Sequence, residues 1–139
     1  MPESLPAGVG LTALAVADAR ARETDRPDRL FDDPFAHLFI DHAGAAFTPV
    51  PSEGGVDIRA MRAEYVAIRT RYFDDALLTA TAAGCRQVVL LAAGLDTRAF
   101  RLAWPGATHL FELDVPDVLA FKSRVLDAHQ AQPTSEDMS

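Results

Sequence analysis

A run of aliphatic residues that ends in a small-residue turn constrains this chain more than any other feature. Residues 87–91 read Gln-Val-Val-Leu-Leu, and residues 92–94 read Ala-Ala-Gly. A short apolar run bounded by small residues predicts a strand that helices cover on both faces, as in parallel sheets. A second strand is predicted at residues 108–113, and Asp114 follows it, twenty residues after Gly94. The chain is therefore expected to begin an open, doubly wound α/β sheet here.

The turn and the acid together predict a nucleoside site. In open α/β sheets, ligands bind at the carboxyl ends of the strands. A small-residue turn lets the backbone approach the ligand, and an acid on the next strand accepts hydrogen bonds from ribose hydroxyls. Ala92, Ala93 and Gly94 form the turn, and Asp114 is the acid. A tight turn without a ligand, and Asp114 as a cap for the following helix, are the alternative interpretations.

The glycine pattern argues against a dinucleotide. The fingerprint Gly-x-Gly-x-x-Gly, which lets a pyrophosphate approach a helix N-terminus, has glycine at positions where this chain has Ala92 and Thr97. A cofactor such as S-adenosylmethionine carries no phosphate and needs only close backbone approach to its amino-acid part. The turn at residues 92–94 can provide that approach.

Most of the residues before the first strand are predicted to be helical. Helices are expected at residues 11–22 and 57–82. A short helix between them is expected to start at Pro34, with Asp33 as its N-cap. The longest helix carries apolar residues at spacings of three and four, which share one face. They are Ile58, Met61, Tyr65, Ile68, Tyr72 and Ala76. A Pro/Gly loop at residues 44–56 is a candidate mobile segment that could close over a substrate.

After the second strand, one more helix is predicted, starting at Pro116, and no third strand. Two charged residues near the sheet are candidates for cofactor binding. Arg69, on the longest helix, either pairs with a cofactor carboxylate or lies on a solvated helix face. Asp96 either organises the turn through local hydrogen bonds or pairs with Arg98 or Arg101.

Composition excludes several classes of function. The 139 residues are 49% hydrophobic and carry a net charge of −7 without a basic run, so a nucleic-acid partner is not expected. The single cysteine, Cys85, excludes an intrachain disulfide and is expected to be a buried structural thiol. The four histidines are scattered, so no metal site is expected. No segment approaches about 18 consecutive apolar residues, so no membrane span is predicted, and a reducing, cytoplasmic setting is expected.

Several motifs together resemble the leucine carboxyl methyltransferase-like family, in particular its branch of S-adenosylmethionine-dependent O-methyltransferases. The resemblance covers residues 9–128 and is most specific at the turn. The motifs are residues 88–102, Phe111-Glu112-Leu113-Asp114-x-Pro116, Phe121-Lys122, the Arg-Leu-Phe-x-Asp-Pro-x-Ala pattern at residues 29–36, and Arg69-Thr70-Arg71-Tyr72-Phe73-Asp74.

The resemblance implies a Rossmann-like class I methyltransferase fold, truncated, with an N-terminal helical cap. Residues 1–86 would form the cap, and residues 87–139 the first βαβα part of the S-adenosylmethionine-binding domain. Arg69 would hold the methionine carboxylate of the cofactor, and Asp114 its ribose hydroxyls. The cofactor's amino-acid part would lie over the turn formed by Ala92, Ala93 and Gly94. Asp96, just after this turn, is counted with them among the residues that bind the cofactor. Related sequences often have glycine in place of Ala92.

The implied reaction is methyl transfer to an oxygen nucleophile, a carboxylate or hydroxyl of a small molecule. No general base is identified, and a carboxylate acceptor would not need one. Family members continue for a similar distance again, so the sequence resembles the N-terminal half of such an enzyme. Two other readings stay open. One is an inactive remnant that binds nucleosides or self-associates through an uncovered sheet edge. The other is a nicotinamide-dependent oxidoreductase fragment.

Overall fold

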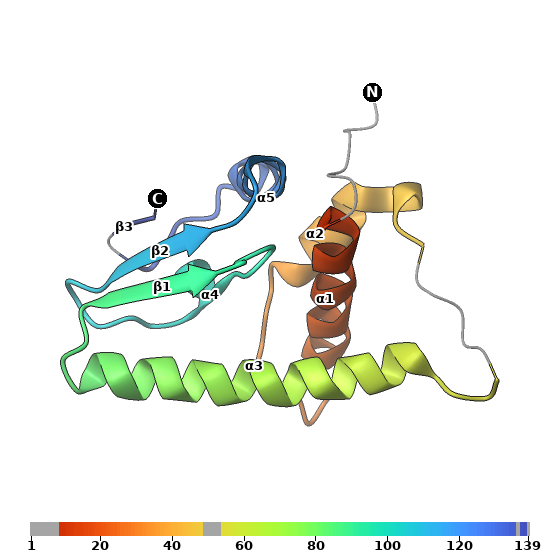
Figure 1. The fold of residues 1–139 in the computed structure, drawn as a ribbon, viewed down its shortest axis with the longest axis horizontal. Helices are drawn as coiled ribbons and strands as arrows, with labels where there is room; N and C mark the ends of the chain where they lie inside the picture. Colours follow the sequence, from red (N-terminus) through yellow and green to blue (C-terminus); the bar gives the residue numbers. More distant parts are fainter. Residues whose placement is uncertain (1–8, 49–53, 136, 139) are drawn as a thin grey trace.

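The computed structural model describes residues 9–48, 54–135, 137 and 138. This part of the chain is mixed α/β, with helices gathered around a small parallel sheet (Figure 1). The elements, in chain order, are α1 (Val9–Thr24), α2 (Ala36–Ala43), the 3₁₀ turn η1 (Gly44–Ala46), α3 (Ile58–Ala82), β1 (Gln87–Leu91), α4 (Arg98–Arg101), β2 (His109–Leu113), α5 (Pro116–Ala128) and β3 (Asp137–Met138).

The sheet has the strand order β1-β2-β3, and both pairs of neighbours are parallel. Strand β1 aligns with β2 from Gln87 opposite His109 to Leu91 opposite Leu113, so the carboxyl ends of both strands lie at one edge. The predictions of strands at residues 87–91 and 108–113 are confirmed. The prediction of no third strand was wrong, since the structure has the short strand β3. This strand could not be predicted, because its two residues lie in a polar tail and show no periodicity.

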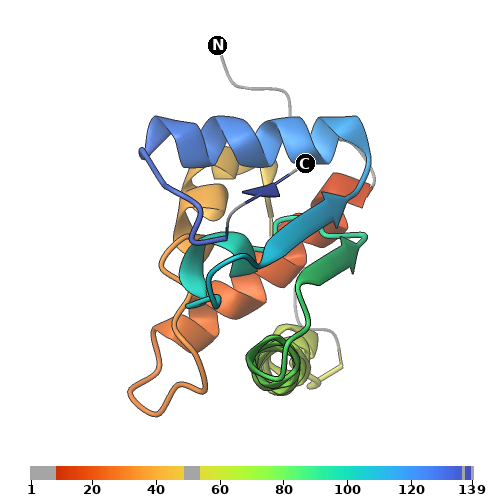
Figure 2. The same cartoon turned by 90° about the vertical axis from the view of Figure 1, so that its left-hand side faces the viewer.

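The sheet is covered well on one face only. On that face, Val88 and Leu110 are buried in a cluster with Val118 and Phe121 of α5. Figure 2 shows α5 at the top and α3 end-on at the bottom, with the strands between them. On the other face, alternate residues of β1 such as Leu91 are exposed. The prediction that β1 is covered on both faces was therefore wrong for the described residues.

One hydrophobic core joins the N-terminal helices to the sheet. Leu14 of α1 and Phe39 of α2 belong to the same cluster as Phe100 and Phe121, and the rings of Phe39 and Phe121 lie 6.3 Å apart. The core forms because α1 packs against both α2 and α3 and α2 also contacts α5. The division of the chain at residue 86 into a cap and a cofactor domain stays a prediction.

The long helix α3 packs through a different face from the one that the apolar spacing indicated. Its buried residues include Val66, Thr70 and Asp74. The six predicted apolar residues do share a face, as expected, but all six are exposed: Ile58, Met61, Tyr65, Ile68, Tyr72 and Ala76. The helix has apolar residues on two faces, so spacing alone could not identify the face that packs against α1.

Three local predictions need correction. Cys85 is exposed, because it lies in the surface connection between α3 and β1, so the prediction of a buried thiol was wrong. Helix α2 begins at Ala36, two residues after the predicted start at Pro34. The N-cap is Phe35, without a side-chain cap, so Asp33 is not the cap of α2, although its carboxylate accepts the N–H of Phe35 at 3.1 Å. The predicted loop at residues 44–56 begins with η1, and residues 49–53 lie outside the described part.

Two searches of the described residues bear on wider classes of function. No helix in the described ranges is both long enough and apolar enough to cross a membrane. The same part of the chain holds no group of three or more His, Cys, Asp or Glu side chains arranged to bind a metal ion.

Candidate functional site

The turn after β1 has an unusual backbone. Ala92 has a φ of +51° and Gly94 a φ of +55°, both in the left-handed region. Glycine adopts this region freely, whereas alanine does so at a cost in conformational energy. A Cβ placed on Gly94 would lie 3.6 Å from the Ala13 Cβ and 4.0 Å from the Asp114 carboxylate, so its need for glycine is conformational rather than steric. A strained, small-residue turn of this kind is typical of a ligand site.

Asp114 contacts this turn directly. Its Oδ2 accepts the backbone N–H of Gly94 at 2.7 Å, and its Oδ1 accepts the N–H of Val115 at 2.6 Å. The N-cap of α5 is Val115, which makes no side-chain cap, so Asp114 is not the helix cap that was the alternative prediction. A carboxylate has about four lone-pair sites, so the half-buried Asp114 keeps acceptor capacity for a ligand.

Two buried cations hold the carbonyl groups that follow Gly94. Arg20 of α1 donates from Nη2 to the Leu95 carbonyl at 2.5 Å and from Nε to Asp33 at 2.8 Å. Lys122 of α5 donates from Nζ to the Asp96 carbonyl at 3.1 Å. These bonds come from helices on different sides of the turn and therefore fix its position before any ligand arrives.

Asp96 belongs to a chain of partly buried ion pairs. Its carboxylate accepts from the backbone N–H and the guanidinium of Arg98. Arg98 also donates to Asp74 of α3 at 2.7 Å, and Arg101 donates to both oxygens of Asp74, at 2.7 and 2.8 Å. Burial acts to raise the pKa of Asp96, but the charges of Arg98 and Arg20 outweigh it, and the net pKa is lowered. The predicted pairing of Asp96 with Arg98 is confirmed, and its contact with a cofactor stays a prediction.

A second buried pair lies beneath the turn. The Lys122 ammonium also donates to Glu112 of β2, and both side chains are almost fully buried. Desolvation raises the pKa of Glu112, although the nearby Lys122 charge acts to lower it. Lys122 therefore joins Glu112 to the backbone of Asp96. Its ammonium group connects α5, β2 and the turn.

The sequence predictions missed the residues that hold the turn: Arg20, Asp74, Glu112 and Lys122. For Lys122 a signal exists, since it is a lysine at helical spacing from Val118 and Val125 on the apolar face of α5. Arg20 and Asp74 carry no comparable local signal. Their partners are 75 and 24 residues away in the chain, and only the fold brings them together.

Arg69 lies apart from this network. It is exposed on α3, and its guanidinium lies 5.6 Å from the ring centre of Phe73. Within the described residues, no hydrogen bond or ion pair joins Arg69 to the turn. Its neighbour Arg71 pairs with Asp75 at 3.0 Å and donates to the Leu30 carbonyl at 2.7 Å. The role of Arg69 toward a cofactor stays a prediction.

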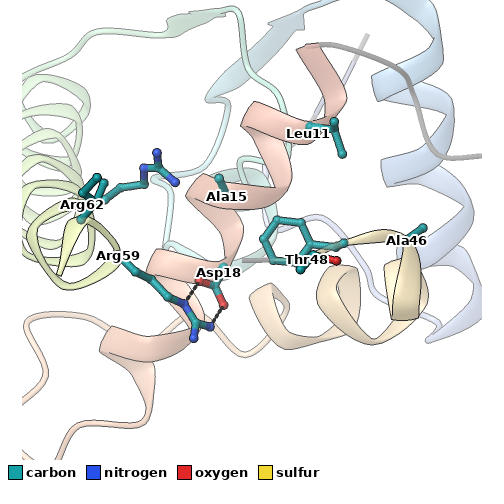
Figure 3. A pocket seen from close by; sticks show the side chains of 9 residues that line it. Leu11, Ala15, Asp18, Ala46, Thr48, Arg59 and Arg62 are labelled. Atoms are coloured by element: carbon teal, nitrogen blue, oxygen red, sulfur yellow. Dashed lines mark hydrogen bonds and ion pairs between the residues drawn. The ribbon is translucent and has the colours of Figure 1, made fainter. Parts of the chain in front are cut away.

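A cavity of about 320 Å³ lies between α1, η1 and the start of α3 (Figure 3). Asp18 accepts two hydrogen bonds from Arg59 there, at 2.6 and 2.7 Å, and Arg62 reaches from α3 toward α1. The cavity is lined on α1 by Leu11, Ala15 and Asp18. Ala13, which contacts the Gly94 position, points from the opposite side of α1. The cavity is therefore separated from the turn by the width of a helix.

Comparison with known proteins found one matching family model and several similar relatives. The sequence model of a family described as leucine carboxyl methyltransferase matches residues 13–138. A relative from Parafrankia sp., named "Putative S-adenosyl-L-methionine-dependent methyltransferase", is 57% identical over 133 residues, or 94% of this chain and 43% of the relative. Relatives with that description from Frankia alni and Saccharopolyspora erythraea are each 51% identical, over 95% and 93% of this chain and 47% and 45% of their own length. The chain thus spans less than half the length of these relatives.

Proposed function

Since the chain belongs to the leucine carboxyl methyltransferase family, we propose that it binds S-adenosyl-L-methionine at the turn after β1 and takes part in methyl transfer. The observation that supports this best is the bond between the Asp114 carboxylate and the Gly94 N–H, which joins the acid of one strand to the turn of the other. The Rossmann-like class I methyltransferase fold is part of the same proposal. The parallel β1–β2 pair with its site at the carboxyl edge supports it.

The residues present fit this cofactor. Ala92, Ala93 and Gly94 would lie beneath its amino-acid part, where the left-handed backbone leaves room for close approach. Asp114 would accept hydrogen bonds from the ribose hydroxyls with the lone pairs that Gly94 and Val115 leave free. These bonds would be charge-assisted and therefore stronger than neutral ones.

We assign Asp96 and Arg69 different parts in this site. Asp96 is held by Arg98 and ionised through its lowered pKa, so it would present a fixed negative charge at the end of the turn. Arg69 would pair with the methionine carboxylate of the cofactor. Its exposed guanidinium has no carboxylate partner among the described residues and is therefore available for this pairing.

The acceptor is proposed to be an oxygen nucleophile of a small molecule, a carboxylate or a hydroxyl. The bound cofactor supplies an electrophilic methyl group, and the protein supplies position and orientation for an in-line displacement. A carboxylate acceptor is already ionised near pH 7 and needs no general base. The cavity beside Asp18 and Arg59 is not the assigned acceptor site, because α1 separates it from Gly94.

A calorimetric titration of the purified chain with S-adenosylhomocysteine tests the proposal. We expect saturable one-to-one binding and no binding of NAD, whose pyrophosphate needs glycine at Ala92 and Thr97. The Arg69→Gln variant should bind S-adenosylhomocysteine more weakly than the Arg71→Gln variant. Arg71 is a matched control because it is exposed on the same helix and already paired with Asp75. A folded chain that binds neither nucleoside would contradict the proposal for this chain.

A further inference from the structure

The cavity between α1, η1 and the start of α3 has an apolar wall that remains in contact with solvent. Leu11 of α1 and Ile58 of α3 line it, and their exposed fractions are 49% and 42%. Ala15 and Phe47 add further apolar surface to the lining. The cavity volume of about 320 Å³ lies at the lower end of the range for small-molecule pockets, about 300–1,000 Å³. The cavity is therefore large enough for a small ligand that has an apolar part.

Two of the three charged side chains that line the cavity neutralise each other. Asp18 is only 7% exposed, and its carboxylate accepts two hydrogen bonds from the Arg59 guanidinium, at 2.6 and 2.7 Å. This is the bidentate geometry that a guanidinium makes with a carboxylate. A buried carboxylate needs such a partner, so Arg59 is committed to Asp18 and is not available to a ligand.

Arg62 is the third charged side chain, and within the described residues no hydrogen bond or ion pair holds it. Figure 3 shows its side chain extending from α3 toward Ala15 of α1. The residue is partly buried, so its guanidinium has lost part of its hydration without gaining a partner. The cavity therefore has one uncompensated positive charge beside an apolar wall, which favours an anion with an apolar part.

We propose that this cavity binds a small monocarboxylate with an apolar chain or ring. The carboxylate would pair with the Arg62 guanidinium, whose planar fork matches it, and the apolar part would lie against Leu11 and Ile58. The hydroxyl of Thr48, which also lines the cavity, would be a second donor to the carboxylate. A phosphate dianion is a poorer match, because the cavity offers one free cation and the Asp18 carboxylate borders the same space.

The two faces of α1 keep this ligand apart from the proposed cofactor and methyl acceptor. Ala13 and Arg20, seven residues apart, share the face that contacts the turn after β1. Leu11, Ala15 and Asp18, at spacings of four and three, share the opposite face, which lines the cavity. A carboxylate held at Arg62 is therefore separated from the turn by α1. The inference does not depend on the proposed methyl transfer.

Titration of the complete chain with octanoate, followed by ¹H–¹⁵N NMR, tests the proposal. We expect saturable one-to-one binding, with the shifted amides in α1 and the first turns of α3. Octanamide, the neutral analogue, should bind at least about tenfold more weakly, because it carries no charge for Arg62. Arg62→Gln should weaken octanoate binding by a similar factor, and Ala15→Leu should weaken it by filling the cavity. Arg124→Gln is the matched control, since Arg124 is exposed on α5 and has no ion pair within the described residues.

Each outcome decides the proposal. Weaker binding in Arg62→Gln with unchanged binding in Arg124→Gln supports it, and circular dichroism checks that both variants are folded. Equal affinity of Arg62→Gln and the unaltered chain, or no saturable binding by the folded chain, would overturn it. Tighter binding of inorganic phosphate than of octanoate would overturn the class of ligand. The comparison of octanoate with octanamide uses the unaltered chain and so does not depend on any variant. The titration contains no S-adenosylhomocysteine, so its result is independent of the cofactor site.

Discussion

The Asp114 carboxylate accepts the backbone N–H of Gly94 at 2.7 Å, although the two residues are twenty positions apart in the chain. The bond joins the end of β2 to the turn after β1, and Asp114 is also the residue proposed to hold the ribose of the cofactor. The same side chain therefore has a structural bond and free acceptor capacity, and substitutions can separate the two.

Asp114→Ala should weaken binding of S-adenosylhomocysteine by about 1–3 kcal/mol, or roughly 5- to 150-fold in Kd, because charge-assisted hydrogen bonds are lost. Calorimetric titration measures the change. Asp114→Asn keeps an oxygen that accepts the Gly94 N–H. This variant should therefore preserve the stability of the turn better than it preserves the affinity for S-adenosylhomocysteine. Asp117→Asn, an exposed acid on the next helix, should bind like the unaltered chain. Equal affinity of Asp114→Ala and the unaltered chain would leave Asp114 as a structural residue only.

Ala92→Gly should stabilise the protein by roughly 0.5–1 kcal/mol. The left-handed φ of +51° costs alanine about 1–2 kcal/mol, and the greater flexibility of unfolded glycine offsets part of the gain. Urea unfolding measures the difference. Ala93→Gly is the neighbouring control, with no left-handed strain to relieve, and should destabilise by roughly 0.5–1 kcal/mol. Two destabilised variants would show that Ala92 is not strained.

Asp74→Asn should destabilise the protein by about 3–5 kcal/mol, because it leaves Arg98 and Arg101 buried without their shared carboxylate. Asp75→Asn removes the adjacent carboxylate, whose pair with Arg71 is on the surface, and should cost less than about 1 kcal/mol. Thermal and urea unfolding of both variants give the comparison. Similar losses of unfolding free energy in the two variants would show that the bonds of Asp74 to Arg98 and Arg101 do not hold α4 to α3.

Glu112 and Asp96 should affect stability against pH with opposite signs. The pKa of Glu112 is raised in the folded state, so its contribution to stability falls as pH rises from its ordinary value of 4.5 through the raised value. Glu112→Gln should remove that decline from unfolding free energies measured between about pH 4 and 7.

The pKa of Asp96 is lowered, so its contribution is present above its ordinary value of 3.8 and is lost as pH falls toward the folded value. Asp96→Asn should therefore flatten the acid side of the same profile and leave the side above 4.5 unchanged. If both variants flattened the same side of the profile of stability against pH, the directions assigned to the two pKa shifts would be contradicted.

The strand, the turn and the acid were readable from sequence because each depends on neighbouring residues. An aliphatic run at residues 87–91, small residues after it and an acid after the next run together predict the site edge, and the structure places Gly94 and Asp114 in contact there. The two-residue strand β3 was not predictable, since two residues carry no periodicity.

The support of the turn could not be predicted in this way. Arg20 bonds the Leu95 carbonyl from 75 residues away, and Asp74 holds Arg98 from 24 residues away. Whether a charged side chain on a helix meets water or a buried partner depends on which face packs. The packed and the exposed face of α3 could not be told apart for the same reason, whereas Cys85 is exposed because it lies in the connection between α3 and β1.

The sequence by itself determined the family, the order of the longer helices and of strands β1 and β2, and the residues of the candidate turn, because short-range patterns encode local backbone structure. Only the tertiary structure decided which face of α3 is covered, which cations hold Leu95 and Asp96, and that Asp114 bonds Gly94. These are contacts between distant segments, and their free energy depends on burial and side-chain direction, which no local pattern specifies.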